Sequence, residues 1–186
     1  MFPISLDLSR VRVALIGGGP AIARRLALLD EDGAREVDVY AIFPSPTLAA
    51  AAGSRLHRRL PEARDLSRTA VVFIADLDDG LDDRLAALAR SLGALVNVED
   101  RKALSDFHSP SVLLRGAVTI PVSTNGRAPG LARRLRRRLE GAIGPEWRDR
   151  VEELGARRTE WRRRGKSLGE LSRLTDDYID DRGWLS

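Results

Sequence analysis

The first hundred residues alternate between two spacings of hydrophobic positions. Short apolar runs rich in β-branched residues predict strands at residues 11–16, 36–43, 70–75 and 94–98, and a short edge strand at residues 56–60. Helical spacing between these runs predicts helices at residues 21–29, 46–52 and 79–92. Strands that alternate with helices are typical of a parallel sheet with right-handed connections. We therefore predict an α/β fold with a Rossmann-like parallel sheet.

Local signals agree with two of these helices. Ser45 and Pro46 fit the N-cap and the first turn of the second helix. In the third helix, one face carries a row of leucines: Leu81, Leu85, Leu88 and Leu92. These signals support both predicted helices.

The pattern changes after Asp100. The run "SVLLRGAVTIPVS" predicts a β-hairpin with a tight turn at Arg115–Gly116, and further helices are expected at residues 129–144 and 146–164. Ser167 and Glu170 have the spacing of a capping box for a last helix. We predict a dinucleotide-binding domain over residues 1–110, a dimerisation region over residues 111–144 and a C-terminal helical region over residues 145–186.

The hairpin is the reason to expect a dimer. Two strands alone do not bury both of their faces, so a second subunit would supply the missing cover. The alternative is that the C-terminal helices cover the hairpin within one chain.

Composition excludes several classes of protein. The chain of 186 residues is 43% hydrophobic, which is enough for a packed core, and it has no cysteine, so disulfides and thiolate metal sites are excluded. No apolar run is long enough to span a bilayer, and the N-terminus lacks the pattern of a secretory signal. We expect a cytoplasmic protein with no membrane contact. The two histidines, His57 and His108, do not make a metal site.

Charge is distributed unevenly. Residues 1–110 hold 14 basic and 16 acidic side chains, whereas residues 111–186 hold 17 and 11. The basic C-terminal part favours an anionic partner. Its arginine-rich helix either forms a guanidinium surface for carboxylates or phosphates, or is simply solvated. An aromatic content of 5%, without an interleaved stacking pattern, argues against nucleic acid.

Three glycines, Gly17 to Gly19, directly follow the first predicted strand. A sharp turn there lets backbone approach a pyrophosphate, and the following helix offers free N–H groups to the phosphates. Pro20 suits the first helical turn because it has no N–H to satisfy. Ile22 stands where a small residue usually packs the helix on the strand, which predicts a poorer fit there. The alternative is a purely structural turn.

The second strand lacks the usual ribose-binding carboxylate at its tip. In dinucleotide-binding folds an acid about 20 residues beyond the glycines accepts the ribose hydroxyls. Here the strand ends in Tyr40, Ala41, Ile42 and Phe43, and strand alternation can turn Asp38 away. We expect backbone groups near Ala41 and Ile42 to hold the ribose. Residue types alone do not choose NAD over NADP.

Two polar segments are candidates for chemistry. Asp100 falls at the carboxyl end of a strand, where ligands of parallel sheets bind, and is either a proton acceptor or a turn residue. His108 follows in the same segment. Ser123, Thr124 and Asn125 form a polar loop before the helix that carries Arg133, which suits an anion.

The ordered set of motifs "LIGGGPAIARR", "FIADLDD", "NVEDRKALSDFHSPS" and "VSTNGRAPGLARRLR" resembles the precorrin-2 dehydrogenase family, the NAD-dependent part of siroheme synthases. The resemblance implies a homodimer that oxidises precorrin-2 to sirohydrochlorin with NAD in siroheme biosynthesis. It also implies an optional ferrochelatase step with Fe²⁺ as substrate. The alternative is a non-catalytic dinucleotide-binding regulatory protein.

The resemblance also assigns residues. It implies that Asp100 is catalytic and that NAD is bound by Gly17, Gly19, Pro20, Ala21, Ala41, Ile42, Ala75 and Asp76. Contacts to the tetrapyrrole are expected from His108, Ser123, Thr124, Asn125 and Arg133. In the family's S-[ST]-G-G-x-S-P loop, Asn125 here replaces the first glycine and Ala128 the serine. Asn125 is a mild change because Asn tolerates a left-handed backbone.

Overall fold

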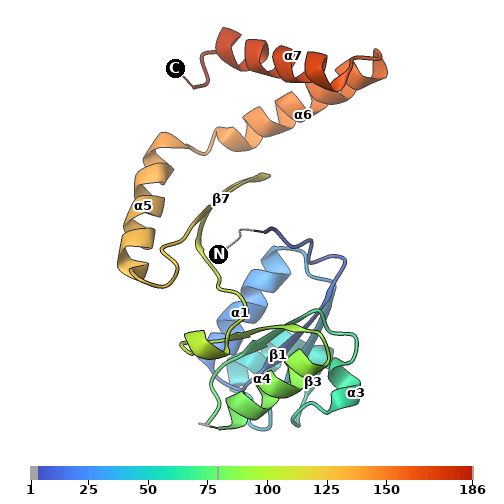
Figure 1. The fold of residues 1–186 in the computed structure, drawn as a ribbon, viewed down its shortest axis with the longest axis vertical. Helices are drawn as coiled ribbons and strands as arrows, with labels where there is room; N and C mark the ends of the chain where they lie inside the picture. The colour runs from blue at the N-terminus through green and yellow to red at the C-terminus, as the bar shows by residue number, and fades with distance from the viewer. Residues whose placement is uncertain (1–3, 79, 186) are drawn as a thin grey trace. The chain divides into compact units, whose positions relative to one another are not determined.

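The chain divides into two compact units. The computed structural model describes residues 4–78 and 80–185, and the division falls between Met1–Ser109 and Pro110–Ser186 (Figure 1). The first unit contains the predicted parallel sheet with its helices, and the second contains the hairpin and the C-terminal helices.

The first unit is built on a five-stranded parallel sheet with the strand order β3-β2-β1-β4-β5. Its strands are β1 (Arg12–Ile16), β2 (Glu36–Tyr40), β3 (Leu56–His57), β4 (Val71–Ile74) and β5 (Leu95–Val98). The strand order and the layers confirm the predicted Rossmann-like fold. Strand β2 stops at Tyr40 and not at Phe43, because its partner β1 ends at Ile16 and the chain then turns at Gly17.

The described residues of this unit form the helices α1 (Pro20–Glu31), α2 (Pro46–Ala52), α3 (Ala63–Leu66) and α4 (Leu81–Ser91). A 3₁₀ turn, η1 (Gly53–Arg55), precedes β3, and another, η2 (Lys102–Leu104), follows β5. Helix α4 begins at Leu81, whereas we predicted Asp79, which lies outside the described residues. Ser45 caps α2 as predicted, since its Oγ accepts the N–H of Leu48 at 3.2 Å.

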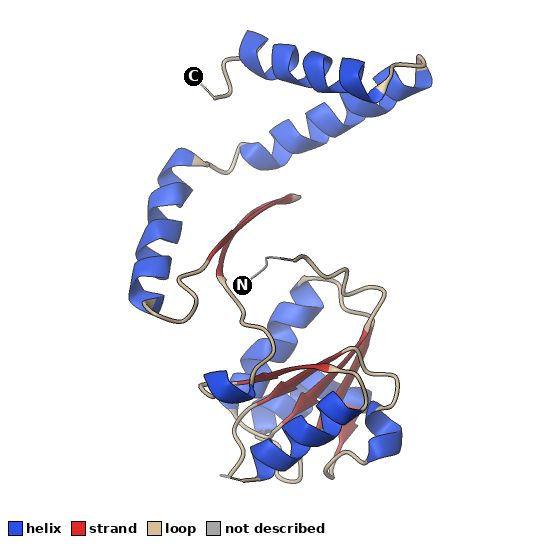
Figure 2. Cartoon of the chain, viewed as in Figure 1, coloured by secondary structure: helices blue, strands red, loops and turns tan. Residues whose placement is uncertain are grey.

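Helices cover both faces of the sheet (Figure 2). Alternate residues of β1 serve the two sides: Val13 and Leu15 pack with α1 and α2, and Ala14 and Ile16 belong to the cluster that includes residues of α3 and α4. All four of these residues are buried, as expected for a parallel sheet covered on both faces. The predicted leucine row of α4 packs on this second side.

The second unit begins with the antiparallel hairpin β6 (Ser111–Arg115) and β7 (Val118–Val122). The turn lies one residue later than predicted, at residues 116–117, because Arg115 still pairs with Val118. Three helices follow, namely α5 (Pro129–Ala142), α6 (Trp147–Arg163) and α7 (Leu168–Asp181). The predicted capping box is present, with Ser167 and Glu170 each accepting from the other's backbone.

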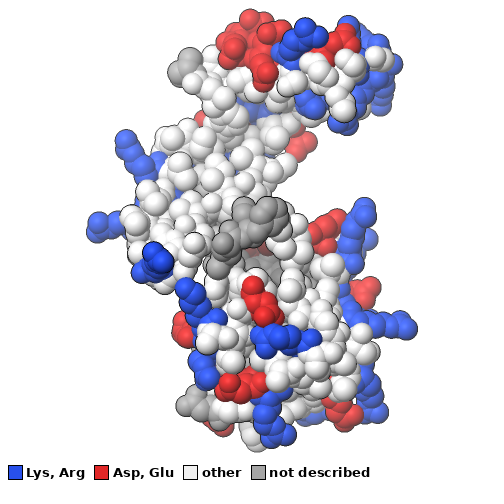
Figure 3. Space-filling model, in the orientation of Figure 1, with Lys and Arg blue, Asp and Glu red and all other residues white. Residues whose placement is uncertain are grey.

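Within the part of the chain that the structure describes, no helix combines the length and the apolar character needed to cross a membrane. On the face of the first unit seen in Figure 3, basic and acidic side chains are interspersed.

Candidate functional site

The carboxyl ends of β1, β4 and β5 lie together at one edge of the sheet. Ile16 pairs with Ile74, and Ile74 pairs with Val98, so these strands end in register. The segments that follow them contain Gly17, Asp76 and Asp100 respectively. Ligands of doubly wound sheets bind outside this edge, where the strand order reverses. The topology thus brings the glycine turn and two of the predicted site carboxylates to one edge of the sheet.

The first two glycines are required by the protein's own backbone. Gly17 has φ of 137°, and a Cβ there would overlap the carbonyl oxygen of Ala75. A Cβ at Gly18 would overlap the carbonyl oxygen of Phe43. The turn is held in place by two hydrogen bonds, from Gly17 N to Tyr40 O (2.9 Å) and from Ser45 N to Gly18 O (2.7 Å). The glycine turn therefore packs between the segments that end β4 and β2.

The third glycine faces a carboxylate. A Cβ at Gly19 would lie 2.5 Å from Asp76 Cγ. Asp76 Oδ2 accepts the backbone N–H groups of Ala21 (3.0 Å) and Ile22 (3.3 Å) in the first turn of α1. A carboxylate at this place is favoured by the partial positive charge of a helix N-terminus. The position therefore already binds anionic oxygen, which is the chemistry that a pyrophosphate requires.

The expected poor fit at Ile22 is wrong. Ile22 is 1% exposed and belongs to the hydrophobic cluster on the α1 side of the sheet. Its side chain lies beneath the turn, with Cγ1 3.1 Å from the position of a Cβ at Gly17. The larger side chain fills the space between helix and sheet instead of separating them.

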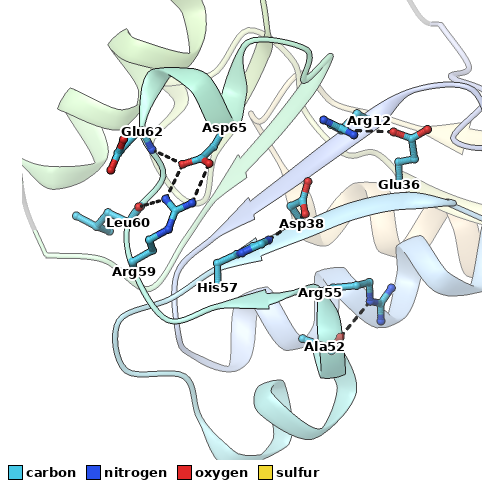
Figure 4. Close-up of polar contacts among 10 residues, drawn as sticks. All are labelled: Arg12, Glu36, Asp38, Ala52, Arg55, His57, Arg59, Leu60, Glu62 and Asp65. Atoms are coloured by element: carbon cyan, nitrogen blue, oxygen red, sulfur yellow. Dashed lines mark hydrogen bonds and ion pairs between the residues drawn. The ribbon is translucent and has the colours of Figure 1, made fainter.

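The tip of β2 carries no carboxylate, and the nearby Asp38 is paired with the edge strand. Asp38 Oδ1 lies 3.0 Å from His57 Nε2 on β3 (Figure 4). The His57 ring stacks on Tyr40, with ring centroids 4.7 Å apart. Burial, followed by the nearby Asp38 carboxylate, raises the pKa of the Tyr40 phenol to about 12. Beyond the strand, Ala41 is buried and Ile42 is half exposed.

Just after β3, Arg59 forms an ion pair with Asp65 of α3. Arg59 contacts Asp65 through both terminal nitrogens, at 2.5 and 2.8 Å (Figure 4). This bidentate hydrogen bonding lowers the pKa of the Asp65 carboxyl below its ordinary value. Strand β3 itself pairs with β2, where His57 lies opposite Tyr40.

Asp100 is an exposed residue in a turn at the end of β5, with φ of 57°. The turn is supported by residues to which we had assigned no role. Ser105 Oγ accepts from Val98 N (3.0 Å) and donates to Val98 O (3.1 Å), and Asp106 Oδ2 accepts from Val96 N (2.9 Å). Arg101 reaches Asp82 Oδ2 at 3.0 Å and Asp83 Oδ2 at 3.1 Å on α4.

His108 lies at the end of this returning segment and is half-buried. The preceding Phe107 packs edge-on to Phe73, with ring centroids 5.4 Å apart, and accepts a hydrogen bond from the buried Asn97 side chain (2.8 Å). Asn97, Ser105 and Asp106 hold the returning segment against β5 through hydrogen bonds to backbone groups. In the sequence they appear only as polar residues within and after an apolar strand, and their spacing does not reveal these partners.

The remaining predicted substrate residues belong to the second unit. Ser123 Oγ accepts from Asn125 N and Thr124 Oγ1 accepts from Ala128 N, both at 3.1 Å. Asn125 has φ of 53°, which confirms the left-handed backbone expected at this position. Each hydroxyl still has its own proton to donate. Next to the loop, α5 has a hollow of about 420 Å³ lined by Gly130, Arg133, Arg134, Arg136 and Arg137.

Among residues 4–78 and 80–185, no group of three or more metal-ligating side chains is placed to hold a metal ion.

Comparisons with known proteins agree with this geometry. Residues 4–111 match the protein family described as "Putative NAD(P)-binding". The chain belongs to this NAD(P)-binding family. Residues 115–142 match a second family, described as "Sirohaem biosynthesis protein central".

Among individual relatives, a siroheme synthase of Neisseria meningitidis is 35% identical over 184 residues, covering 97% of this chain and 38% of that protein. A siroheme synthase of Gluconobacter oxydans is 33% identical over 190 residues, covering 98% and 40%. The chain thus spans about two fifths of the length of these relatives. A solved structure, "SirC, precorrin-2 dehydrogenase", superposes with a TM-score of 0.75 at 22% identity, covering 100% of this chain and 93% of that one, which confirms the fold.

Membership of the NAD(P)-binding family indicates what the glycine turn binds. The first turn of α1 offers its N–H groups to anionic oxygen, and Gly19 keeps the approach to it free of a Cβ. The residues present therefore fit the diphosphate of a dinucleotide.

Proposed function

We propose that the chain oxidises precorrin-2 to sirohydrochlorin with NAD as the electron acceptor, as a step of siroheme biosynthesis. The observation that carries the proposal is the position of Asp100 at the end of β5, on the sheet edge that also holds the glycine turn of an NAD(P)-binding unit. The likeness to siroheme synthases along nearly the whole chain supports this substrate.

The cofactor would lie along the sheet edge. Its diphosphate would face Gly17, Gly19, Pro20 and Ala21, its ribose would approach the backbone of Ala41 and Ile42, and Ala75 and Asp76 would flank it at the end of β4. NAD⁺, when bound, supplies the acceptor for the hydride that leaves the macrocycle. The protein's own part is to orient the two rings and to exclude water.

Asp100 would act as the general base. Oxidation by two electrons removes a hydride and a proton from precorrin-2, and an Asp100 carboxylate oxygen would accept the proton. We extend the proposal to Fe²⁺ insertion, in which two N–H protons leave the macrocycle as the metal ion enters. The same carboxylate would accept one of these protons, and the second would pass to solvent.

The substrate is a polycarboxylate, and the polar loop and α5 would bind it. Ser123 and Thr124 would donate their hydroxyl protons, Asn125 would contribute its side-chain amide, and Arg133 a bidentate guanidinium. His108, at the end of the first unit, would add a further contact. The excess of basic residues after residue 110 supports an anionic ligand here.

We propose a homodimer formed through residues 111–144, with residues 145–186 as a C-terminal helical region. On the hairpin, Leu114 opposes Thr119 and Val112 opposes Pro121, so these four side chains share one face. Leu114 is 51% exposed. A second copy would cover this face and complete the substrate site.

The decisive experiment is an anaerobic spectroscopic assay of the purified protein with precorrin-2 and NAD⁺. Simultaneous appearance of sirohydrochlorin and NADH is expected, and addition of Fe²⁺ would then test formation of siroheme. Saturable NAD⁺ binding without any oxidation of precorrin-2 would instead favour a non-catalytic regulatory protein.

A further inference from the structure

The first turn of α1 has an unusual cap. In α2 and α7 the capping oxygen belongs to the residue just before the helix, Ser45 and Ser167 respectively. The corresponding residue of α1 is Gly19, which has no side chain, and its cap is supplied by Asp76 from the end of β4. A side chain on Gly19 would collide with Asp76 in this position, so a local cap and the Asp76 cap exclude each other.

Asp76 uses the donors that a phosphate would need. Pro20 has no N–H, and the N–H of Ala23 bonds to Gly19 O at 3.3 Å within the chain. The N–H groups of Ala21 and Ile22 both bond to Asp76 Oδ2. A dinucleotide diphosphate can use these two groups only after the carboxylate has left. A carboxylate and a diphosphate competing for the same two donors would also repel each other.

We propose that Asp76 is a built-in competitor of the cofactor: its carboxylate stands in for the diphosphate at the N-terminus of α1 in the cofactor-free protein and turns away when the dinucleotide binds. This inference rests on the cofactor-binding part of the proposed function and not on the identity of the tetrapyrrole. It makes Asp76 a residue that lowers cofactor affinity by stabilising the form without cofactor, in place of the direct contact to NAD that the family resemblance implies.

The position of Asp76 allows this exchange. Asp76 is an exposed residue, so rotation of its side chain leads to solvent and not into the core. The strand end beneath it stays fixed, because Ala75 N bonds to Ile16 O at 3.1 Å. Its φ of 56° is a left-handed conformation that Asp accepts more readily than most residues. The side chain can therefore leave without rearrangement of the sheet.

The consequence is a linkage between stability and affinity. The cap stabilises the form of the protein without cofactor, and a ligand that must displace it binds more weakly by the same factor. Removing the Asp76 carboxylate should therefore lower the stability of the protein without cofactor and lower the dissociation constant of the dinucleotide. A merely structural cap would lower stability without tightening binding.

The test is calorimetric titration of the full chain with NAD⁺, ADP and adenosine, comparing wild type with Asp76→Ala and Asp76→Asn. Loss of a helix cap corresponds to roughly a five- to tenfold change in an equilibrium constant. We expect the dissociation constants of NAD⁺ and ADP to fall by about that factor in Asp76→Ala. Adenosine, which has no phosphate, should bind unchanged. Asp76→Asn keeps the shape but not the charge, and serves if the alanine variant does not fold.

Asp78→Ala is the matched control, since it removes a carboxylate from the same loop and leaves both Asp76 hydrogen bonds in place. Its NAD⁺ affinity should equal that of wild type. Equal or weaker NAD⁺ binding by both Asp76 variants, with normal binding by wild type, would overturn the inference and leave the proposed function standing. An equal gain for adenosine or for Asp78→Ala would also overturn it. Absence of NAD⁺ binding in every form of the protein would overturn both proposals.

Discussion

The carboxylate of Asp38 is paired with His57 Nε2 at 3.0 Å, on the edge strand and not at the tip of β2. The tip of β2 therefore offers no carboxylate to accept the ribose hydroxyls or to repel a 2′-phosphate. We expect weak discrimination between NAD⁺ and NADP⁺, with dissociation constants within about tenfold of each other. Calorimetric titration with both cofactors measures the ratio. A preference for NAD⁺ of several orders of magnitude would show that Asp38 leaves His57 and reaches the ribose.

Asp100→Asn separates catalysis from cofactor binding. Asn accepts the left-handed φ of 57° as Asp does, so the substitution removes the base and keeps the turn. We expect kcat for precorrin-2 oxidation to fall by about 10²- to 10⁴-fold, while the dissociation constant of NAD⁺ stays within twofold, about the scatter of the measurement. Anaerobic turnover and calorimetry give the two quantities. Turnover at the wild-type rate would exclude Asp100 as the base.

Gly17→Ala tests how the glycine turn is built. A methyl group there would overlap the carbonyl oxygen of Ala75, and φ of 137° is strained for any side chain. We expect a loss of more than about 4 kcal/mol in the free energy of unfolding, measured by urea denaturation. Gly33→Ala is the control: its φ is 77°, but no atom lies within 4 Å of the added Cβ, so about 1–2 kcal/mol is expected. Similar losses in both variants would show that the clash is relieved by movement of β4.

Leu114→Glu tests the dimer. Leu114 and Thr119 face the same side of the hairpin, and Leu114 is 51% exposed in the single chain. A charge buried against a second copy without a partner is strongly unfavourable, so the variant should elute as a monomer where wild type elutes as a dimer. Light scattering after size-exclusion chromatography gives the mass. Thr119→Glu, placed opposite on the same face, should act in the same direction. Dimers formed by both variants would exclude this face as the interface.

Much of the fold follows from the sequence because its signals are local. Apolar runs of β-branched residues located β1, β4 and β5, and the cap residues Ser45 and Ser167 marked two helix starts. Contacts between residues far apart in the sequence could not be predicted from such local signals. The contact of Asp76 with α1 joins residues 55 positions apart, and the pairing of Asp38 with His57 depends on which strand lies at the sheet edge. The poor fit expected at Ile22 is wrong because the space between helix and strand is set by the packed fold, where Ile22 is buried.

The C-terminal helices should show a defined acid response. Hydrogen bonds from Lys166, then from the backbone and hydroxyl of Ser167, lower the pKa of Glu170 from 4.5 to about 2. A carboxyl whose pKa is lowered by folding stabilises the folded state above its ordinary pKa, and this stabilisation is lost as the pH falls through the folded value. We therefore expect the stability of α7 to decline between pH 4.5 and about 2, followed by circular dichroism during thermal unfolding. Glu170→Gln should flatten this part of the pH profile, because the neutral side chain does not titrate. Glu152→Gln, an exposed position in α6, should retain the wild-type profile, and equal flattening in both variants would assign the response to net charge instead of the capping box.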